Sequence, residues 1–328
     1  MKKGKYLITG CAGFIGSHLV KTLINNYDVM LVDDLSEGSR SKLPKPLQKK
    51  LIRRKIQDIK NLNFKGIKGI FHLAAQSSVP ISVKRFYESS RNNLSSSLKV
   101  FEIAKKFSVP VIYASSSAIY GNLPVGDDIK NKFDISSPYA QDKLSLENYA
   151  EMFFKNYNIS SIGLRFFNVY GPNQNANSPY SAVIPIFINR MKKNMPVTVN
   201  GGYQTRDFIY IDDVLKIMKI SMQIAQSKRD SIIFNVGTGR SVNINRLFQM
   251  IKKVVPNKSK IVRKKLDKFD PIKSSGTFKK FKKVLKNKIF NFTSLEDGIK
   301  KTISSYWGLL WNHMIDIAVD PVEGTNFV

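Results

Sequence analysis

The sequence predicts an α/β fold in which a doubly wound parallel sheet is covered by helices on both faces. Candidate strands and helices alternate through the first half of the chain, which is typical of such a sheet. A glycine-rich turn joins the first strand to the first helix, and two carboxylates end the second strand. Together these features indicate a Rossmann-type fold, which binds its ligands at the carboxyl ends of the strands.

The spacing of apolar residues gives the order of the elements. Short apolar runs bounded by turn residues predict strands at Tyr6–Thr9, Val29–Asp33, Leu51–Ile56, Gly69–Leu73, Pro110–Ser115 and Ser160–Arg165. Segments with helical periodicity predict helices at Phe14–Asn25, Asn92–Phe107 and Pro138–Tyr157, and the polar, proline-broken stretch Ser36–Lys50 predicts a loop or short helix. This alternation requires crossover connections, so the strands are expected to be parallel.

From Gly171 the pattern changes to an asparagine-rich loop followed by shorter elements. We expect helices at Val183–Lys192, Val214–Ala225, Val242–Val255 and Ser294–Trp307, strands at Val197–Asn200, Arg206–Ile211 and Ile232–Val236, and irregular, lysine-rich chain at Lys258–Lys288. These elements predict a smaller α/β unit beside the main sheet. The segment 308–328 lacks lysine and carries acidic residues, so we interpret it as an appended tail of unknown role.

Composition restricts the class of protein. The chain has 328 residues, 42% of them hydrophobic, and can bury the core of one large domain or two interleaved ones. A net charge of +29 can indicate a nucleic-acid or membrane-surface partner, but the basic residues are scattered and no nucleic-acid motif accompanies them, so we expect no nucleic-acid partner. A single cysteine, Cys11, excludes an intramolecular disulfide and a multi-cysteine metal site, and we expect no metal. Neither a signal peptide nor an 18-residue apolar run is present, which predicts a cytoplasmic protein without membrane insertion.

The turn after the first strand contains three glycines, Gly10, Gly13 and Gly16. They allow a tight turn, close approach of the backbone to a phosphate, and packing of the new helix on the strand. The helix N-terminus then presents unpaired N–H groups and a partial positive charge to the anion. Asp33 follows roughly 20 residues later, where such folds place the acid that holds the adenosine ribose hydroxyls. Because a carboxylate there would repel a 2′-phosphate, the expected cofactor is NAD rather than NADP.

A second group of polar residues predicts proton transfer. Tyr139 and Lys143 are four residues apart in a predicted helix and share one face. A phenol is a poor base at neutral pH, but a nearby ammonium group favours its ionised form. Ser115, Ser116 and Ser117 stand at the end of the fifth predicted strand. A Tyr-x-x-x-Lys pair alone is common, whereas the same pair with a glycine turn and strand-end serines favours catalysis.

These motifs resemble those of the extended short-chain dehydrogenase/reductase family, in its branch of NAD-dependent nucleotide-sugar epimerases and dehydratases. The resemblance covers Tyr6 to about Trp307. Its motifs are Thr9–Gly16, Val32–Ser36, His72–Gln76, Ser115–Ser117, Tyr139 with Lys143, Leu164–Pro172 and Thr205–Asp213. The series is specific for the family and less so for the substrate.

The resemblance implies a role for each member of the catalytic group. Tyr139 would take the proton from the C4 hydroxyl of a sugar as hydride leaves for NAD, and Lys143 would hold the cofactor ribose and lower the pKa of Tyr139. Ser116 would hydrogen-bond the same sugar oxygen, and Ser117 is the alternative if the register differs by one residue. The 4-keto sugar would then turn over and take the hydride back on its other face, so that NAD is regenerated.

The resemblance also implies the binding residues. The NAD site is expected to comprise Gly10, Gly13, Phe14, Ile15, Gly16, Asp33, Asp34, Asp58, Ile59, Leu73, Ala74, Ala75, Asn93, Tyr139 and Lys143. The substrate site is expected to comprise Ser116, Asn168, Val183, Arg206 and Ser274. Arg206 would pair with the diphosphate, and Ser274 would leave room for an N-acetyl group. An arginine expected near Ile272 is missing, and Lys273 is the candidate to replace it.

Family organisation implies the domains and the assembly. An NAD-binding Rossmann domain is expected at 1–172, with 203–236 returning to it, and a substrate-binding domain at 173–202 and 237–307, followed by the tail 308–328. A homodimer is expected to form through the predicted helices Asn92–Phe107 and Pro138–Tyr157.

Differences within the family narrow the reaction. Ser117 and Ala118 stand where dehydratases carry Asp-Glu, so dehydration is disfavoured. The stretch Asn173–Pro185 is similar to that of epimerases acting on UDP-N-acetylglucosamine and its uronic acid. We therefore predict a UDP-sugar 4-epimerase for UDP-N-acetylglucosamine and UDP-N-acetylgalactosamine, or the uronic acid forms. The alternatives are a UDP-glucose/UDP-galactose 4-epimerase, a UDP-glucuronate epimerase or decarboxylase, and a non-catalytic NAD-sensing protein.

Overall fold

A parallel sheet of seven strands forms the centre of the protein, seen here in a computed structural model that describes residues 3–60, 63–130, 132–176, 182–266, 270–285 and 291–305. The strand order is β10-β6-β5-β4-β1-β2-β3. Their bounds are β1 (Lys5–Thr9), β2 (Asp28–Val32), β3 (Leu51–Ile52), β4 (Ile67–His72), β5 (Val111–Ser116), β6 (Ser161–Phe166) and β10 (Ser231–Val236). Strands β1 to β6 have the order of a dinucleotide-binding sheet, 3-2-1-4-5-6, so the predicted Rossmann-type fold is confirmed.

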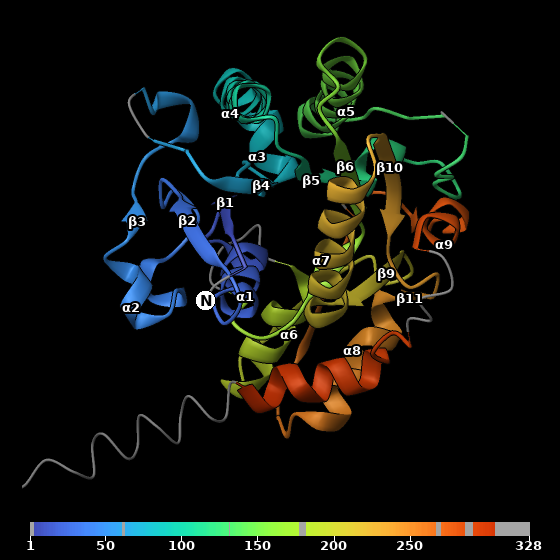
Figure 1. The fold of residues 1–328 in the computed structure, drawn as a ribbon. Helices are drawn as coiled ribbons and strands as arrows, with labels where there is room; N and C mark the ends of the chain where they lie inside the picture. Colours follow the sequence, from blue (N-terminus) through green and yellow to red (C-terminus); the bar gives the residue numbers. More distant parts are fainter. Residues whose placement is uncertain are drawn as a thin grey trace, which may run out of the picture.

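Helices cover both faces of this sheet (Figure 1). One face carries α3 (Val79–Lys84), α4 (Phe86–Phe107) and α5 (Pro138–Tyr157), with α4 and α5 side by side. The other carries α1 (Phe14–Leu23) and α7 (Ile211–Ser227), which contact each other. Short helical segments connect the strands at η1 (Arg40–Lys42), α2 (Lys45–Gln48), η2 (Ile56–Asp58) and η3 (Ser117–Tyr120).

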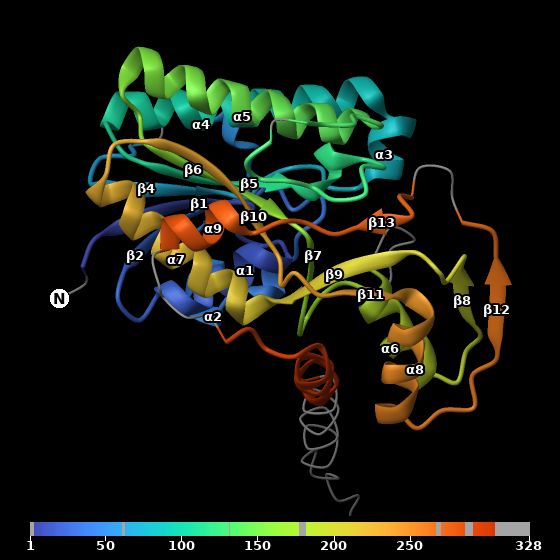
Figure 2. The ribbon, with the colours of Figure 1, turned by 90° about the vertical axis from the view of Figure 1, so that its right-hand side faces the viewer.

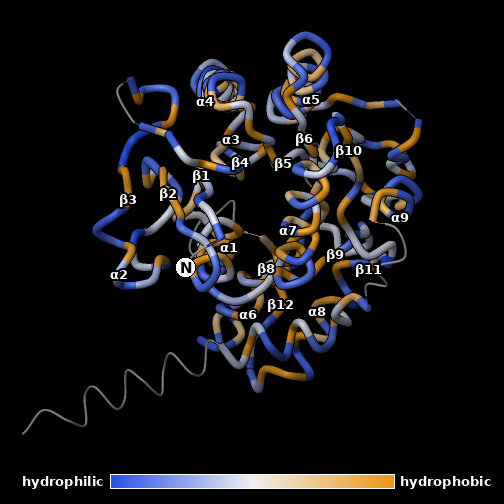
Figure 3. The backbone as a smooth tube through the Cα atoms, viewed as in Figure 1, coloured by the Kyte–Doolittle hydropathy of each residue, from blue (hydrophilic) through white to orange (hydrophobic). Residues whose placement is uncertain are grey.

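The sheet is buried on both faces. Leu7 and Ile8 are neighbours in β1 and fully buried, yet they belong to hydrophobic clusters on opposite sides of the sheet. Figure 3 shows hydrophobic and hydrophilic segments alternating along α7, whose buried residues pack on one of these sides. A strand that is buried on both faces of its sheet has a continuous run of apolar residues, which is why the central strands could be predicted from sequence.

A smaller unit lies beyond the carboxyl ends of the strands (Figure 2). Its elements are a sheet of β7 (Asn168–Tyr170), β9 (Thr205–Tyr210), β11 (Ser241–Asn243) and β13 (Lys273–Ser274), a two-stranded sheet of β8 (Val197–Asn200) and β12 (Ile261–Lys264), and helices α6 (Val183–Lys192) and α8 (Ile244–Val254). Helix α9 (Lys279–Leu285) contacts β10, and residues 295–305 are helical. Within the range 203–236, β10 is a strand of the central sheet and α7 packs against that sheet, whereas β9 belongs to the smaller sheet. The domain boundaries themselves stay a prediction.

Three expectations about elements need correction. Strand β3 is two residues long because the chain turns into η2, and α4 begins six residues before Asn92 because its polar first turns lack helical periodicity. The range Lys258–Lys288 is not irregular in its described part: β12 pairs with β8, β13 pairs with β9, and α9 follows. These pairings join residues far apart in sequence, which local periodicity does not report.

Several further expectations lie partly or wholly outside the described residues, among them the tail 308–328 and the end of the predicted helix Ser294–Trp307. No helix in the described ranges combines the length and apolar character that crossing a membrane requires. Those same ranges contain no group of three or more His, Cys, Asp or Glu side chains arranged to hold a metal ion. Cys11 is free and fully buried.

Candidate active site

The glycine turn lies where β1 ends and α1 begins. Gly10 has a φ of 69°, in the region that favours glycine, and its N–H donates to the carbonyl of Val32 at 2.9 Å. A Cβ on Gly10 would lie 2.6 Å from the backbone nitrogen of Ala74, and one on Gly16 would lie 2.0 Å from the carbonyl oxygen of Gly10. Gly13 precedes α1 without a side-chain cap, so the N–H groups of the first turn are available to an anion.

Asp33 closes the other side of this turn. Its carboxylate accepts hydrogen bonds from the backbone N–H groups of Ala12 and Leu35, both at 2.8 Å. Burial raises the pKa of Asp33, and these N–H groups oppose the rise by favouring the carboxylate. Asp34 accepts bonds from the N–H and hydroxyl of Ser36 and is thereby held beside it. Asp33 therefore fixes the glycine turn as well as facing the cavity above it.

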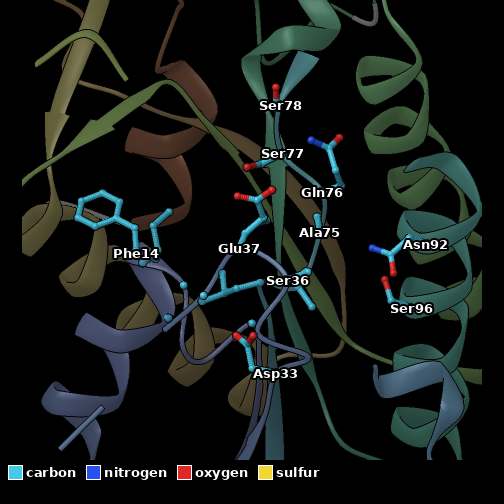
Figure 4. Close-up of a pocket in the computed structure, with 18 of the residues that line it drawn as sticks. Phe14, Asp33, Ser36, Glu37, Ala75, Gln76, Ser77, Ser78, Asn92 and Ser96 are labelled. Carbon is cyan, nitrogen blue, oxygen red and sulfur yellow. The ribbon is translucent and has the colours of Figure 1, made fainter. Parts of the chain in front are cut away.

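A cavity of about 500 Å³ runs along the carboxyl ends of the central strands. The predicted cofactor residues that line it are Gly10, Gly13, Phe14, Ile15, Gly16, Asp33, Asp34, Leu73, Ala74, Ala75, Tyr139 and Lys143. Figure 4 shows Asp33 and Glu37 from the β2 side of this cavity, and Asn92 and Ser96 from α4. These features fit an adenine dinucleotide with a free 2′-hydroxyl. They are the glycine turn, whose space Cβ atoms would fill, the uncapped N-terminus of α1 and the carboxylate of Asp33 beside them.

Three predicted cofactor residues do not line the cavity. Asp58 is exposed and Ile59 is buried, and the preceding residues Arg54–Gln57 border the cavity instead. Ser36–Gly38 and Lys42 also border it, and sequence reasoning missed them because the polar loop after β2 carries no periodic signal.

The third is Asn93, which is buried in α4 and hydrogen-bonds the backbone of the loop after β4. Its side chain accepts from the N–H of Gln76 at 2.8 Å and donates to the carboxylate of Asp142 at 2.9 Å. Asn93 therefore ties the loop after β4 to α5, and its neighbours Asn92 and Ser96 face the cavity.

Tyr139, Lys143 and Ser116 all line this cavity. Lys143 Nζ donates to the carbonyl of Ala114 at 2.7 Å and lies 5.6 Å from the centre of the Tyr139 ring. Burial lowers the pKa of Lys143 to about 8, against the carboxylates of Asp142 and Glu147, which raise it. Burial also raises the pKa of Tyr139, and a hydrogen bond with Ser116 opposes that rise. Ser116 rather than Ser117 thus contacts the tyrosine.

A second cavity, of about 250 Å³, adjoins the first and shares Ser116 and Tyr139 with it. Its other lining residues include the predicted substrate residues Asn168, Arg206 and Ser274, together with Ser117, the alternative catalytic serine, and Lys273. Val183 borders neither cavity, and the preceding residue Ala182 borders the first. The wall is rich in serine hydroxyls, which suits a ligand with many hydroxyl groups.

Two of these residues already have partners. Arg206 forms an ion pair with Asp270 and donates to the carbonyl of Thr205 at 2.7 Å. Asn168 donates to the carbonyl of Asp207 at 3.2 Å. Arg206 still faces the second cavity, where a guanidinium can bind a diphosphate through two parallel hydrogen bonds.

A cavity lined by a glycine turn, an acidic strand end and a Tyr–Lys–Ser group is typical of an enzyme of the dehydrogenase type, in which proton removal from an alcohol accompanies hydride transfer. The family model for the NAD dependent epimerase/dehydratase family matches residues 6–237. The chain belongs to this family, and it is accordingly an NAD-dependent enzyme of nucleotide sugars.

Individual relatives agree with this assignment. A Methanocaldococcus jannaschii protein, provisionally named UDP-glucose 4-epimerase, is 37% identical over 75% of this chain and 81% of its own. The structure of a UDP-N-acetylglucosamine 4-epimerase from Methanobrevibacter ruminantium, in complex with UDP-N-acetylmuramic acid, is 33% identical with a TM-score of 0.83, over 94% of this chain and all of that one. A UDP-glucose 4-epimerase from Thermotoga maritima, with UDP-glucose, is 35% identical with a TM-score of 0.83, over 93% of this chain and 99% of that one.

Proposed function

We propose that this chain interconverts the C4 epimers UDP-N-acetylglucosamine and UDP-N-acetylgalactosamine, or their uronic acid forms. The observation that carries the proposal is the placement of Ser116, Tyr139 and Lys143 where the dinucleotide cavity meets the second cavity. An alcohol bound in the second cavity would reach the phenol oxygen and a nicotinamide ring at once. The likeness to UDP-sugar 4-epimerases supports the same reaction.

In this reaction Tyr139 holds and moves the proton of the C4 hydroxyl. The ammonium of Lys143, fixed on the carbonyl of Ala114, stabilises the phenolate form, and Ser116 orients the sugar oxygen toward it. NAD, when bound, supplies reversible hydride transfer at C4. Burial of Tyr139 and Lys143 limits access of water, so Tyr139 can keep the proton taken from the C4 hydroxyl while the 4-keto sugar turns over.

The lining of the second cavity favours an N-acetylated sugar as the substrate. Ser117, Ser274 and Ser275 line it with small side chains, which would leave room for an N-acetyl group on the bound sugar. Ser117 and Ala118 also supply no acid–base pair for dehydration. The Methanobrevibacter enzyme, whose structure holds a UDP-linked N-acetyl sugar, supports the same preference.

A panel of UDP-sugars tests this proposal. The purified protein is incubated with UDP-N-acetylglucosamine, UDP-glucose and UDP-glucuronate, and the products are resolved by NMR. We expect kcat/KM for the N-acetylated sugar to exceed that for UDP-glucose by about tenfold or more, because one substituent in a fitted pocket contributes that much. Denaturation should release NAD and not NADP. The reverse preference would favour the UDP-glucose enzyme, loss of CO₂ would indicate decarboxylation, and no turnover of any sugar would favour an NAD-sensing protein.

We also propose that the protein is a homodimer that pairs α4 and α5 with their copies. Apolar side chains are exposed along these helices: Phe86, Tyr87, Leu98, Tyr149 and Tyr157. Light scattering on the eluted protein should give twice the mass of one chain, and Leu98→Glu should shift it toward the monomer. A wild-type monomer would contradict the proposal. The cytoplasmic location stays a prediction.

A further inference from the structure

Helix α5 buries a third ionisable side chain on the face that carries Tyr139 and Lys143. Glu147 lies one turn beyond Lys143 and is 2% exposed, and the reaction described above gives it no task. The three residues follow at intervals of four, so they line up along the helix. Their partners are three consecutive residues at the end of β5.

Three hydrogen bonds between α5 and β5 each join one of these helix residues to one strand residue. Lys143 donates to the carbonyl of Ala114, and Tyr139 shares a hydrogen bond with Ser116. Between them, the hydroxyl of Ser115 donates to Glu147 Oε1 at 2.5 Å. Glu147 therefore anchors the helix to the strand residue next to the catalytic serine.

Glu147 is in turn held by Arg165 on β6. Arg165 Nε and NH2 donate to the two carboxylate oxygens, each at 2.8 Å, and both side chains are at least 96% buried. The remaining nitrogen, NH1, donates to the hydroxyl of Tyr120 at 2.7 Å. This paired geometry fixes the guanidinium and the carboxylate in one plane.

The chain of hydrogen bonds continues into the substrate wall. The Tyr120 hydroxyl donates to Asn235 Oδ1 at 2.7 Å, and Asn235 Nδ2 donates to the carbonyls of Gly126 and Thr277 at 3.0 and 2.8 Å. Gly126 pairs with Gly276 in an isolated bridge, directly after the cavity-lining Ser274 and Ser275. One buried path thus runs from the catalytic helix to the wall of the second cavity.

We propose that Glu147, Arg165, Tyr120 and Asn235 form a positioning chain that holds the catalytic pair of α5 in fixed register with the sugar-binding wall. The inference rests on the proposed function, because it assigns these residues to the epimerisation site. Because replacing a buried ion pair with apolar residues of similar volume is often neutral for stability, we assign these buried charges a role in orientation. Glu147, Arg165 and Asn235 border neither cavity and act through Tyr139, Lys143 and the 274–277 wall, whereas Tyr120 itself borders the second cavity.

The charge of Glu147 also acts on Lys143. The groups that face this ammonium are Tyr139, Asp142 and Glu147 from α5 and His72 from β4, and burial lowers the pKa of His72 to about 3, which leaves it neutral. The positive charges of Arg165 on β6 and Lys280 on α9 also interact with the carboxylate of Glu147. Replacing Glu147 with a neutral residue removes a charge that raises the pKa of Lys143 and leaves Arg165 uncompensated, so both changes lower that pKa.

The test compares Glu147→Gln and Glu147→Asp with Glu151→Gln, which makes the same chemical change one turn further on, at an exposed pair with Lys155. In the NAD-loaded enzyme we expect Glu147→Gln to lower kcat by about 10²-fold with a smaller change in KM, because a misplaced catalytic group costs that much. The alkaline limb of its pH profile should move to lower pH. Glu147→Asp keeps the charge and should keep the limb, and Glu151→Gln should match wild type.

A second variant tests the far end. Tyr120→Phe removes one hydroxyl, and we expect it to raise KM for the UDP-sugar by about tenfold and to act less than multiplicatively with Glu147→Gln, because both break one chain. The inference would be overturned if Glu147→Gln had the kcat and the alkaline limb of wild type. It would also be overturned if the effects of Glu147→Gln and Tyr120→Phe on kcat/KM were multiplicative in the double variant. If Glu147→Gln does not fold, the double variant of Glu147→Asp and Tyr120→Phe decides: effects on kcat/KM that are less than multiplicative support the inference, and multiplicative effects overturn it.

A readout without substrate separates this inference from the proposed function. The pKa of Lys143 is followed by the NMR shift of its Cε carbon, assigned by its loss in Lys143→Arg. We expect the pKa to fall in Glu147→Gln and to be retained in Glu147→Asp and Glu151→Gln. That result with no UDP-sugar turnover by wild type would support the positioning chain and reject the proposed function, whereas turnover with an unchanged pKa and kcat would do the opposite.

Discussion

Tyr139→Phe is expected to lower kcat by about 10²–10⁴-fold while the fold and the bound cofactor are retained, because a positioned acid–base group contributes that much to a proton transfer. The substitution removes one oxygen, whose contact is Ser116, and leaves the ring in its buried site. The backbone N–H of residue 139 keeps its bond to Ser82. Steady-state turnover of the preferred UDP-sugar measures the loss, and the absorbance of released NAD measures cofactor content.

Tyr157→Phe is the matched control for this variant. It makes the same change on the same helix, but Tyr157 is exposed at the C-terminal end of α5 and borders neither cavity. Phenylalanine also keeps the apolar ring that the proposed dimer surface would use. We expect its kcat to stay within about twofold of wild type, as surface substitutions generally do. A Tyr139→Phe enzyme that kept most of its activity would show that another group carries the proton.

Gly10→Ala is expected to abolish cofactor retention. The new methyl group would meet the backbone of Leu73 and Ala74 at 2.6 to 2.8 Å, so either β1 or the loop after β4 must move. Overpacking of this kind costs about 1–3 kcal/mol, and each 1.4 kcal/mol lost from binding weakens affinity about tenfold. The protein as purified should contain little NAD, and its melting temperature should fall.

Gly66→Ala separates the methyl contact from backbone strain. Gly66 has a φ of 80°, close to the 69° of Gly10, but a Cβ there would have no atom within 4 Å. Both variants therefore carry a similar penalty of about 1–2 kcal/mol for a left-handed residue, and only Gly10→Ala adds the clash. Equal melting temperatures and equal NAD content in the two variants would contradict the close approach of the turn to β4.

The fold was predictable where the signal is local. The central strands are apolar on both faces, and α5 begins and ends at Pro138 and Tyr157 as expected, between a serine cap at Ser137 and a left-handed Asn158. In contrast, β12 and β13 exist because remote strands offer pairing partners, and their lysine-rich sequences give no strand signal. Long-range pairing of this kind is not encoded in a window of neighbouring residues.

The site divides in the same way. Spacing placed the glycines, Asp33, Tyr139 and Lys143 at the cavity because strand ends meet at one edge of a parallel sheet. Spacing could not tell that Asn93 faces the backbone of Gln76, or that Asp58 faces solvent one residue past the cavity. It also could not pair Glu147 with Arg165, although the interval of four from Lys143 marked the correct helix face.

Isotope tracing tests the central claim most directly. A UDP-sugar carrying deuterium at C4 is converted by the wild-type enzyme in ordinary water, and the product is analysed by NMR. If hydride leaves C4 and returns to it while Tyr139 handles only the hydroxyl proton, the epimer retains deuterium at C4. Replacement of that deuterium by hydrogen from water would contradict the claim, because it would mean that C4 itself is deprotonated.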